Sequence, residues 1–186
     1  MTLTSAEEKL VRSAKDGEFA DFSSADLPAN YPAQGGEWGS ERTIRAEIIY
    51  ALAVGTNPDW TVHAKGIQVC GARIVGALDF QAAKITRPLA LVNCYVAELI
   101  TLIDARAVTI ALYGSYIRGL SAFRLIASGS VLLNKGFIAA EEGGAVRGAY
   151  RRGSRLRRRN SEEFVWASVI CRRFASSRQR IPEGLE

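Results

Sequence analysis

The sequence is poor in the residues that carry most metal, disulfide and acid–base chemistry. It contains three cysteines, Cys70, Cys94 and Cys171, and a single histidine, His63. The cysteines are too few and too widely spaced for a disulfide framework or a zinc site. The chain also lacks a C-x-x-C pair, an H-E-x-x-H motif, a P-loop and a G-x-G-x-x-G turn. No motif therefore predicts a catalytic residue, a metal site or a cofactor site, and we expect none of them.

Long apolar runs are absent as well. No stretch approaches the roughly 20 apolar residues that a membrane-spanning helix requires, and the N-terminal stretch MTLTSAEEKL is too polar for a secretory signal. Hydrophobic residues make up 48% and charged residues 23% of the 186 residues, which is typical of a folded domain. We expect a reduced, cytoplasmic protein, for which any contact with a membrane would be peripheral.

The excess of basic over acidic residues is confined to the C-terminal end of the chain. The formal net charge is +5, from 24 basic and 19 acidic residues. Residues 144–186 hold 11 arginines and 4 acidic residues, a balance of +7, which leaves 13 basic and 15 acidic residues in 1–143, a balance of −2. An anionic partner such as nucleic acid is therefore indicated only for the arginine-rich tail.

The N-terminal region, 1–60, reads as helical. Ser5 and Glu8 form a capping-box pattern, and Gly17 is a suitable end for the helix that follows. The stretch 18–39 holds two prolines and three glycines, which predicts irregular structure. Ser40 then caps a second predicted helix over 41–54, whose apolar stripe we expect to pack on its own domain.

From residue 67 the sequence repeats at a nearly constant spacing of about 11 residues. Seven segments begin at Ile67, Leu78, Leu89, Ile100, Ile110, Leu120 and Val131. Within each segment the first, third and eighth positions are mostly apolar, and the sixth position is mostly Ala, Cys, Ser or Gly. Alternation of this kind predicts two very short strands separated by a corner.

Segments this short bury their apolar faces only by stacking on one another. Two segments make a coil of about 21 residues, so seven segments make about 3.5 coils. The sequence therefore predicts a mainly β fold, a right-handed quadrilateral β-solenoid. We expect a helical cap over 1–60, the solenoid over 61–139 and a tail over 140–186.

The columns of the repeat resemble the pentapeptide-repeat family. The clearest matches are Ala72-Arg-Ile74, Ala83-Lys-Ile85 and Cys94-Tyr-Val96, although the extra residue in each segment departs from strict five-residue spacing. Over residues 5–139, WGSERTIRAEIIYALAVG followed by GARIVGALDF is similar to uncharacterised bacterial pentapeptide-repeat-like proteins. These are often labelled membrane-associated oxidoreductases, and the resemblance implies redox chemistry at a membrane as an alternative function.

The repeat stops after Glu141, where GGAVRGAYRRGSRLRRRN begins. Three interpretations compete: an arginine-rich arm that binds nucleic acid or anionic lipid, a disordered extension, and translation out of frame. We favour the third for the residues after about 143, because a one-base shift lets 150–157 encode a further solenoid segment. Residues 161–175 alternatively predict a short amphipathic helix at this end of the solenoid.

Four side chains are candidates for an interaction surface. Tyr95, Tyr116 and Phe137 follow Arg73 in one outward column, where they either dock a partner or stack between coils, and we favour stacking. Leu133 lies near the end of the repeat, where apolar surface favours self-association. We therefore expect a non-catalytic scaffold or protein-interaction module, with a protein partner or a second copy bound. His63 reads as a residue at the domain junction, Cys94 as a core residue and Cys70 as partly exposed.

Overall fold

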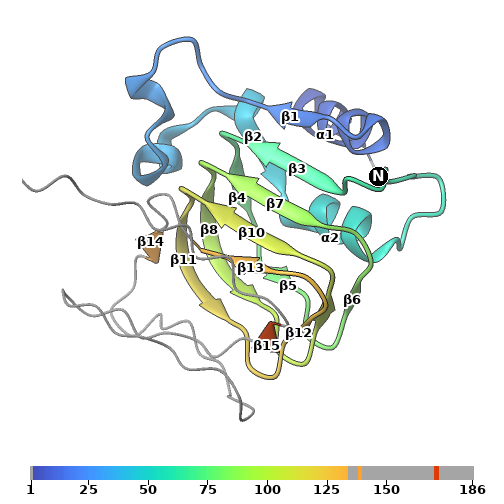
Figure 1. The fold of residues 1–186 in the computed structure, drawn as a ribbon. Coiled ribbons are helices and arrows are strands. Elements are labelled where there is room, and N and C mark those ends of the chain that lie inside the picture. The colour runs from blue at the N-terminus through green and yellow to red at the C-terminus, as the bar shows by residue number, and fades with distance from the viewer. Residues whose placement is uncertain (1, 134–137, 140–169, 172–186) are drawn as a thin grey trace, which may run out of the picture.

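The computed structural model describes residues 2–133, 138–139 and 170–171, and side chains are described up to Leu133. The chain forms a mainly β fold, a solenoid of about three turns built from parallel strands, with a few helices at its N-terminal end. Figure 1 shows the coils stacked one below another, from β3 near the helices to β13. The predicted solenoid is confirmed at this level.

The strands of the described residues form three parallel sheets. The first contains β1 (Phe19–Asp21), β3 (Ile67–Cys70), β7 (Leu89–Val92), β10 (Ile110–Tyr113) and β13 (Val131–Leu132). The second contains β2 (Thr43–Arg45), β4 (Arg73–Val75), β8 (Tyr95–Thr101), β11 (Tyr116–Ser121) and β14 (Ile138–Ala139), with β5 (Leu78–Asp79) paired to β8. The third contains β6 (Lys84–Ile85), β9 (Arg106–Ala107), β12 (Ile126–Ala127) and β15 (Ile170–Cys171).

The strand register confirms the repeat. Ile67 pairs with Leu89, Leu89 with Ile110 and Ile110 with Val131, so each pairing joins the first positions of segments that lie one coil apart. The first position of every segment is buried, as are the eighth positions up to Ala127 and the third positions up to Ala122. Identical positions of successive coils therefore stack into one continuous core.

Two polar members of the small sixth column bond to the coil before them. The Ser115 hydroxyl donates to the Leu91 carbonyl at 3.0 Å and accepts from the Cys94 amide at 3.1 Å. The Cys94 thiol lies 3.7 Å from the Val69 carbonyl, the equivalent acceptor one coil earlier. Both side chains are completely buried, so their size is limited by the core and their polar atoms are used within it.

A left-handed residue turns the corner in the middle of each segment. The fifth position has a positive φ in six successive segments, between 49° and 66°, at Gly71, Ala82, Asn93, Asp104, Gly114 and Arg124. Such a backbone suits glycine and asparagine and is strained for most other residues. The corner thus reverses the side-chain direction in one residue, which places both the third and the sixth positions in the core.

The first helix differs by one residue from its expected start. Helix α1 spans Ser5–Asp16, and Thr4 rather than Ser5 is its N-cap, with Glu7 completing the capping box. The expectation for Ser5 and Glu8 was wrong because the motif is shifted by one position. The helix ends at Gly17, whose φ of 73° is the left-handed C-cap that the glycine predicts.

The segment between the helices contains strands that the sequence did not indicate. We expected irregular structure over 18–39 and a helix over 41–54. Instead β1 lies within the first stretch, three short 3₁₀ turns follow, η1 (Pro28–Asn30), η2 (Pro32–Glu37) and η3 (Ser40–Arg42), and helix α2 spans only Ala46–Val54. The expected helix was wrong over 41–45, because Thr43–Arg45 pairs with β4 as strand β2.

These N-terminal elements cover the first coil. Strands β1 and β2 add to the first and second sheets beside β3 and β4. Helix α2 lies over β5 and β6, where the Tyr50 ring stacks on Phe80 at 5.6 Å and Ile48, Ile49 and Leu52 are buried. Figure 1 shows α1 beside β1 at this end of the molecule. The first coil is therefore covered by β1, β2 and α2 at one end and by the second coil at the other, as the end of a solenoid requires.

An ion pair with a buried carboxylate joins α1 to β2. Arg45 donates from Nε and Nη2 to the two carboxylate oxygens of Glu7, at 2.7 Å each, and the Thr4 amide donates to the same carboxylate at 2.9 Å. The Glu7 side chain is 1% exposed. Burial raises the pKa of Glu7, but the hydrogen bonds from Arg45 and the backbone lower the pKa more, to about 2. Glu7 is therefore ionised in the folded protein at all but strongly acid pH.

This ion pair predicts acid sensitivity. Because the folded pKa of Glu7 lies below its ordinary value of 4.5, its stabilisation is complete above that pH and is lost as the pH falls towards 2. The pKa difference corresponds to about 3 kcal/mol. We expect Glu7→Gln to lose this part of the pH dependence of unfolding, measured by urea titration at several pH values. Glu8→Gln, an exposed neighbour, should keep it. Equal acid dependence in wild type and Glu7→Gln would contradict the assignment.

The tail beyond the last coil lies almost wholly outside the described residues. This applies to the arginine-rich stretch, to the proposed change of reading frame and to most of the expected helix over 161–175. At Ile170 and Cys171 that expectation was wrong, because the two residues form β15, parallel to β12.

Candidate functional site

The tyrosines of the predicted surface stack on one another. In the second sheet, Arg73 pairs with Tyr95 and Tyr95 with Tyr116. The two tyrosine rings are 5.7 Å apart and inclined by only 8°. Their stacking supports the interpretation that we favoured, in which this column links adjacent coils. The next pairing places Ile138 rather than Phe137 opposite Tyr116, and Phe137 itself lies outside the described residues.

The turn η2 covers part of this column. A Cβ atom on Gly35 would lie 2.2 Å from the Cβ atom of Tyr95, and one on Gly36 would lie 3.6 Å from the Tyr95 hydroxyl. The absence of side chains at these two glycines thus lets the 3₁₀ turn sit directly on Tyr95. Both tyrosines are half-buried.

Leu133 is packed against the core rather than displayed on the surface. It follows β13 in the last described coil and is half-buried among the solenoid side chains. The exposed apolar side chains of the later coils lie elsewhere, at Leu99, Phe123 and Ile126, which are 44%, 38% and 50% exposed. None of these three was among the residues expected from the sequence, although Phe123 and Ile126 occupy outward positions of the repeat and could have been found there.

The cysteines and the histidine lie where their pattern suggested. Cys94 is fully buried, and burial raises the pKa of its thiol to about 12. Cys70 is half-buried, and burial raises its pKa as well, so neither thiol ionises readily at neutral pH. His63 accepts from the Lys65 amide at 3.1 Å, and its own amide donates to the Ala14 carbonyl at 2.9 Å. These bonds tie the end of α1 to the start of the first coil.

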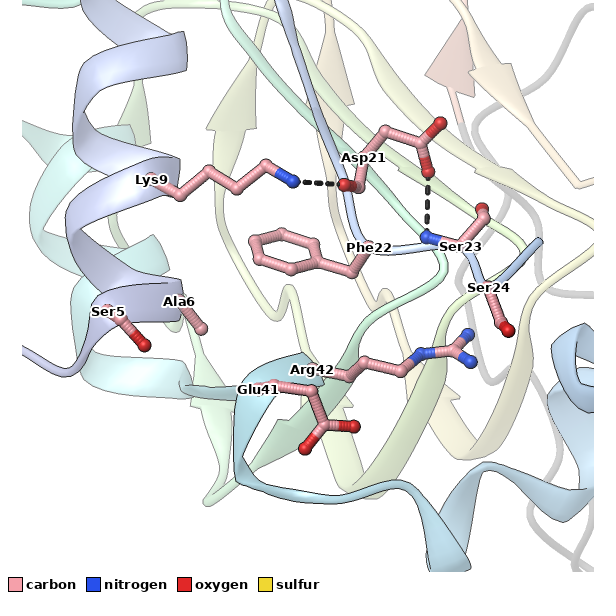
Figure 2. A pocket seen from close by; sticks show the side chains of 9 residues that line it. All are labelled: Ser5, Ala6, Lys9, Asp21, Phe22, Ser23, Ser24, Glu41 and Arg42. Carbon is pink, nitrogen blue, oxygen red and sulfur yellow. Dashed lines mark hydrogen bonds between the residues drawn. The ribbon is translucent and has the colours of Figure 1, made fainter.

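A pocket of about 480 Å³ opens between the start of α1, the end of β1 and η3. Figure 2 shows Phe22 at its centre, Lys9 reaching across from α1 to Asp21, and the Arg42 guanidinium below Ser24. Lys9 donates to the Asp21 carbonyl and lies 4.8 Å from the centre of the Phe22 ring. This pocket could not be predicted from the sequence, because its walls come from three separate segments.

The charges in this pocket balance. Lys9 and Arg42 face Asp21 and Glu41 in the same lining. The hydroxyl and amide of Ser23 hold the pKa of Asp21 below its ordinary value, so its carboxylate stays charged. The Ser23 hydroxyl lies 3.6 Å from the Cys70 thiol, which is a poor base. The Ser23 side chain thus lies between the Asp21 carboxylate and the Cys70 thiol.

No group of three or more His, Cys, Asp or Glu side chains is placed to hold a metal ion among the residues with described positions. Within the same part of the chain, no helix combines the length and hydropathy needed to cross a membrane.

Comparisons of the chain with protein-family models, with curated proteins and with solved structures give no match. The function is therefore inferred from the residues and geometry of the chain itself.

Proposed function

We propose that the protein is a non-catalytic scaffold or protein-interaction module of the pentapeptide-repeat-like kind, with right-handed coils of roughly square section. The observation that carries this proposal is the use of the buried polar side chains. Glu7 holds α1 to β2, and Cys94 and Ser115 bond to carbonyls of the preceding coil. The polar atoms of these groups are bonded to neighbouring segments of the framework, which favours a structural role for them.

The proposed interaction surface lies on the later coils. Its candidate side chains lie on more than one sheet: Leu99 and Tyr116 in the second, Ile126 in the third, Phe123 between β11 and β12, and Leu133 after β13 of the first. Apolar side chains exposed in this way are typical of surfaces that bind another protein. The occupant we propose is a second copy of the chain, joined through the later coils, with the protein in the cytoplasm or bound peripherally at a membrane.

Light scattering on the full chain tests this proposal. The wild type should have a mass that is a multiple of 20.2 kDa, and Ile126→Lys should shift it towards the monomer because a charge there would be buried in the contact. Leu133→Lys should act in the same direction if the surface extends to that residue. Lys84→Gln, in the same outward column as Ile126 but two coils away, is the control.

A monomeric wild type at all accessible concentrations would contradict self-association. The visible absorption spectrum of the purified protein separates this proposal from the alternative of a membrane-associated oxidoreductase. A scaffold should show no visible band, whereas a bound flavin or other redox group would favour the alternative.

A further inference from the structure

The chain between β1 and β2 forms a loop, 23–37, that contains the turns η1 and η2. Figure 1 shows this loop, in blue, extending beyond the sheets at the N-terminal end of the molecule. It displays two large apolar side chains, Leu27 and Tyr31, which are 81% and 55% exposed. Leu27 is the most exposed large apolar side chain of the described residues. We call this segment the Leu27 loop.

Side-chain hydrogen bonds hold the Leu27 loop in one conformation. The Asn30 amide group accepts from the Ser24 backbone amide and donates to the Ser24 carbonyl, at 2.7 Å each. The Ala29 carbonyl accepts from the Trp38 indole at 3.0 Å and from Nη1 of Arg42 at 3.2 Å. A loop that is ordered before it binds loses little conformational entropy in the contact, which favours binding through its exposed side chains.

The exposed side of this loop is negatively charged. Residues 23–37 include Asp26 and Glu37 and no basic residue, and both acidic side chains are exposed. Neither carboxylate has an ion-pair partner in the part of the chain that the structure describes. The nearest bonded cation, Arg42, is itself buried and donates to a carbonyl rather than to a carboxylate. The Leu27 loop therefore suits a surface that is both apolar and positively charged.

The third sheet carries such a surface on its later coils. Ile126 is 50% exposed, Phe123 is 38% exposed, and Arg106 pairs in register with Ile126 from the adjacent coil. Arg106 is exposed and has no carboxylate partner among the described residues. The nearby Asp104 carboxylate is occupied by two hydrogen bonds from Arg124, so these two charges offset each other. We call Arg106, Phe123 and Ile126 the Ile126 face.

The charges of the two surfaces decide how copies of the chain can meet. Two Ile126 faces would place Arg106 against Arg106, and two Leu27 loops would place carboxylates against carboxylates. Like charges brought together in this way oppose association, whereas the loop and the face are complementary. Figure 1 shows the loop and β12 at opposite ends of the molecule, so the two surfaces of one chain do not meet.

We propose that the Leu27 loop of one copy docks on the Ile126 face of another. Leu27 and Tyr31 pack against Ile126 and Phe123, with the Asp26 carboxylate beside the Arg106 guanidinium of the other copy. This inference rests on the self-association proposed above and names the surface that the second copy presents to the later coils.

The test is the association constant of the full chain, measured by light scattering over a range of protein concentrations. Asp26→Lys and Arg106→Glu should each weaken association by about tenfold, because each places like charges across the contact. The double variant Asp26→Lys with Arg106→Glu exchanges the two charges and should restore association to near the wild-type level. Added salt should weaken association of the wild type, since the paired charges are at the rim of the contact.

Leu27→Ser tests the apolar part of the contact. Leu27 is almost fully exposed in the single chain, so its loss should leave the fold intact and weaken association by about tenfold. Glu8→Lys makes the same charge change as Asp26→Lys at an exposed position of α1, outside the loop, and should associate as the wild type does.

The outcomes separate this inference from the proposed function. A monomeric wild type would contradict self-association as a whole. A wild type that associates, but whose association constant is unchanged by Asp26→Lys and Leu27→Ser, would overturn the docking of the loop and leave self-association standing. Failure of the charge exchange to restore association would show that Asp26 and Arg106 do not face each other, and would also overturn it.

Discussion

Ala105→Leu should destabilise the protein by about 1–3 kcal/mol or more, because the added side chain has no room in the core. Ala105 occupies the sixth position of its segment and is completely buried. Its amide donates to the Leu102 carbonyl and its own carbonyl accepts from the Ile126 amide, so the backbone is held on both sides. The free energy of unfolding, measured by urea titration or thermal melting, should show the loss directly.

Ala83→Leu is the matched control. Ala83 occupies the same sixth position one coil earlier, but it is only half-buried against the core. The two alanines occupy equivalent positions of the repeat, but only Ala105 is completely buried in the structure. The larger side chain at residue 83 has a route to solvent, so its cost should be clearly smaller than that of Ala105→Leu. Equal costs at both positions would show that the core is not arranged as described.

Gly66→Ala should have the second large effect. The φ of Gly66 is 83°, and a Cβ atom there would lie 2.0 Å from the Pro88 carbonyl oxygen. That oxygen accepts the Ile67 amide at 2.9 Å, which is the first bond between the coil that begins at Ile67 and the next one. The alanine must therefore separate two backbone segments, and we expect a loss of roughly 3 kcal/mol in the free energy of unfolding.

Gly55→Ala isolates the contribution of backbone strain. Gly55 has a nearly equal φ of 79°, but a Cβ atom there would meet nothing within 4 Å. Its substitution should cost only the penalty of a left-handed alanine, about 1 kcal/mol. If both variants lose the same stability, the close contact between Gly66 and Pro88 contributes nothing, and the spacing between these coils must differ.

The solenoid itself could be predicted because one physical constraint recurs in every segment. Ile67, Leu89, Ile110 and Val131 are aligned by the sequence spacing and are paired by the backbone in the same order. A single segment is too short to reveal the spacing of the buried positions, whereas seven aligned segments reveal it. The left-handed corner was indicated only weakly by the sequence. Gly71 and Gly114 favour this conformation, but Ala82 and Arg124 adopt it although it is unfavourable for their residue types.

The N-terminal strands could not be predicted for a related reason. Thr43–Arg45 is three residues long, and Ile44 fits a helical stripe as well as an alternating strand. Only the neighbouring strand β4 decides between the two, through pairing that local sequence does not reveal. The same applies to β1, which adds to β3 from a stretch rich in turn residues.

The candidate site was predictable only in part. The stacking of Tyr95 on Tyr116 followed from equal positions in neighbouring coils. The pocket of Figure 2 did not, since Lys9, Asp21 and Arg42 belong to three segments that the fold brings together.

Nuclear Overhauser contacts between backbone protons test the central claim, which is that successive coils stack on one another in parallel register. In the full chain, cross-peaks should connect the strand around Leu89 with those around Ile67 and Ile110, in the parallel pattern of the described register. The amide of Ile67 should be among the slowest to exchange, since it bonds to Pro88 in the next coil. Contacts between the strands around Ile67 and Leu78 in an antiparallel pattern would instead indicate hairpins and would contradict the solenoid.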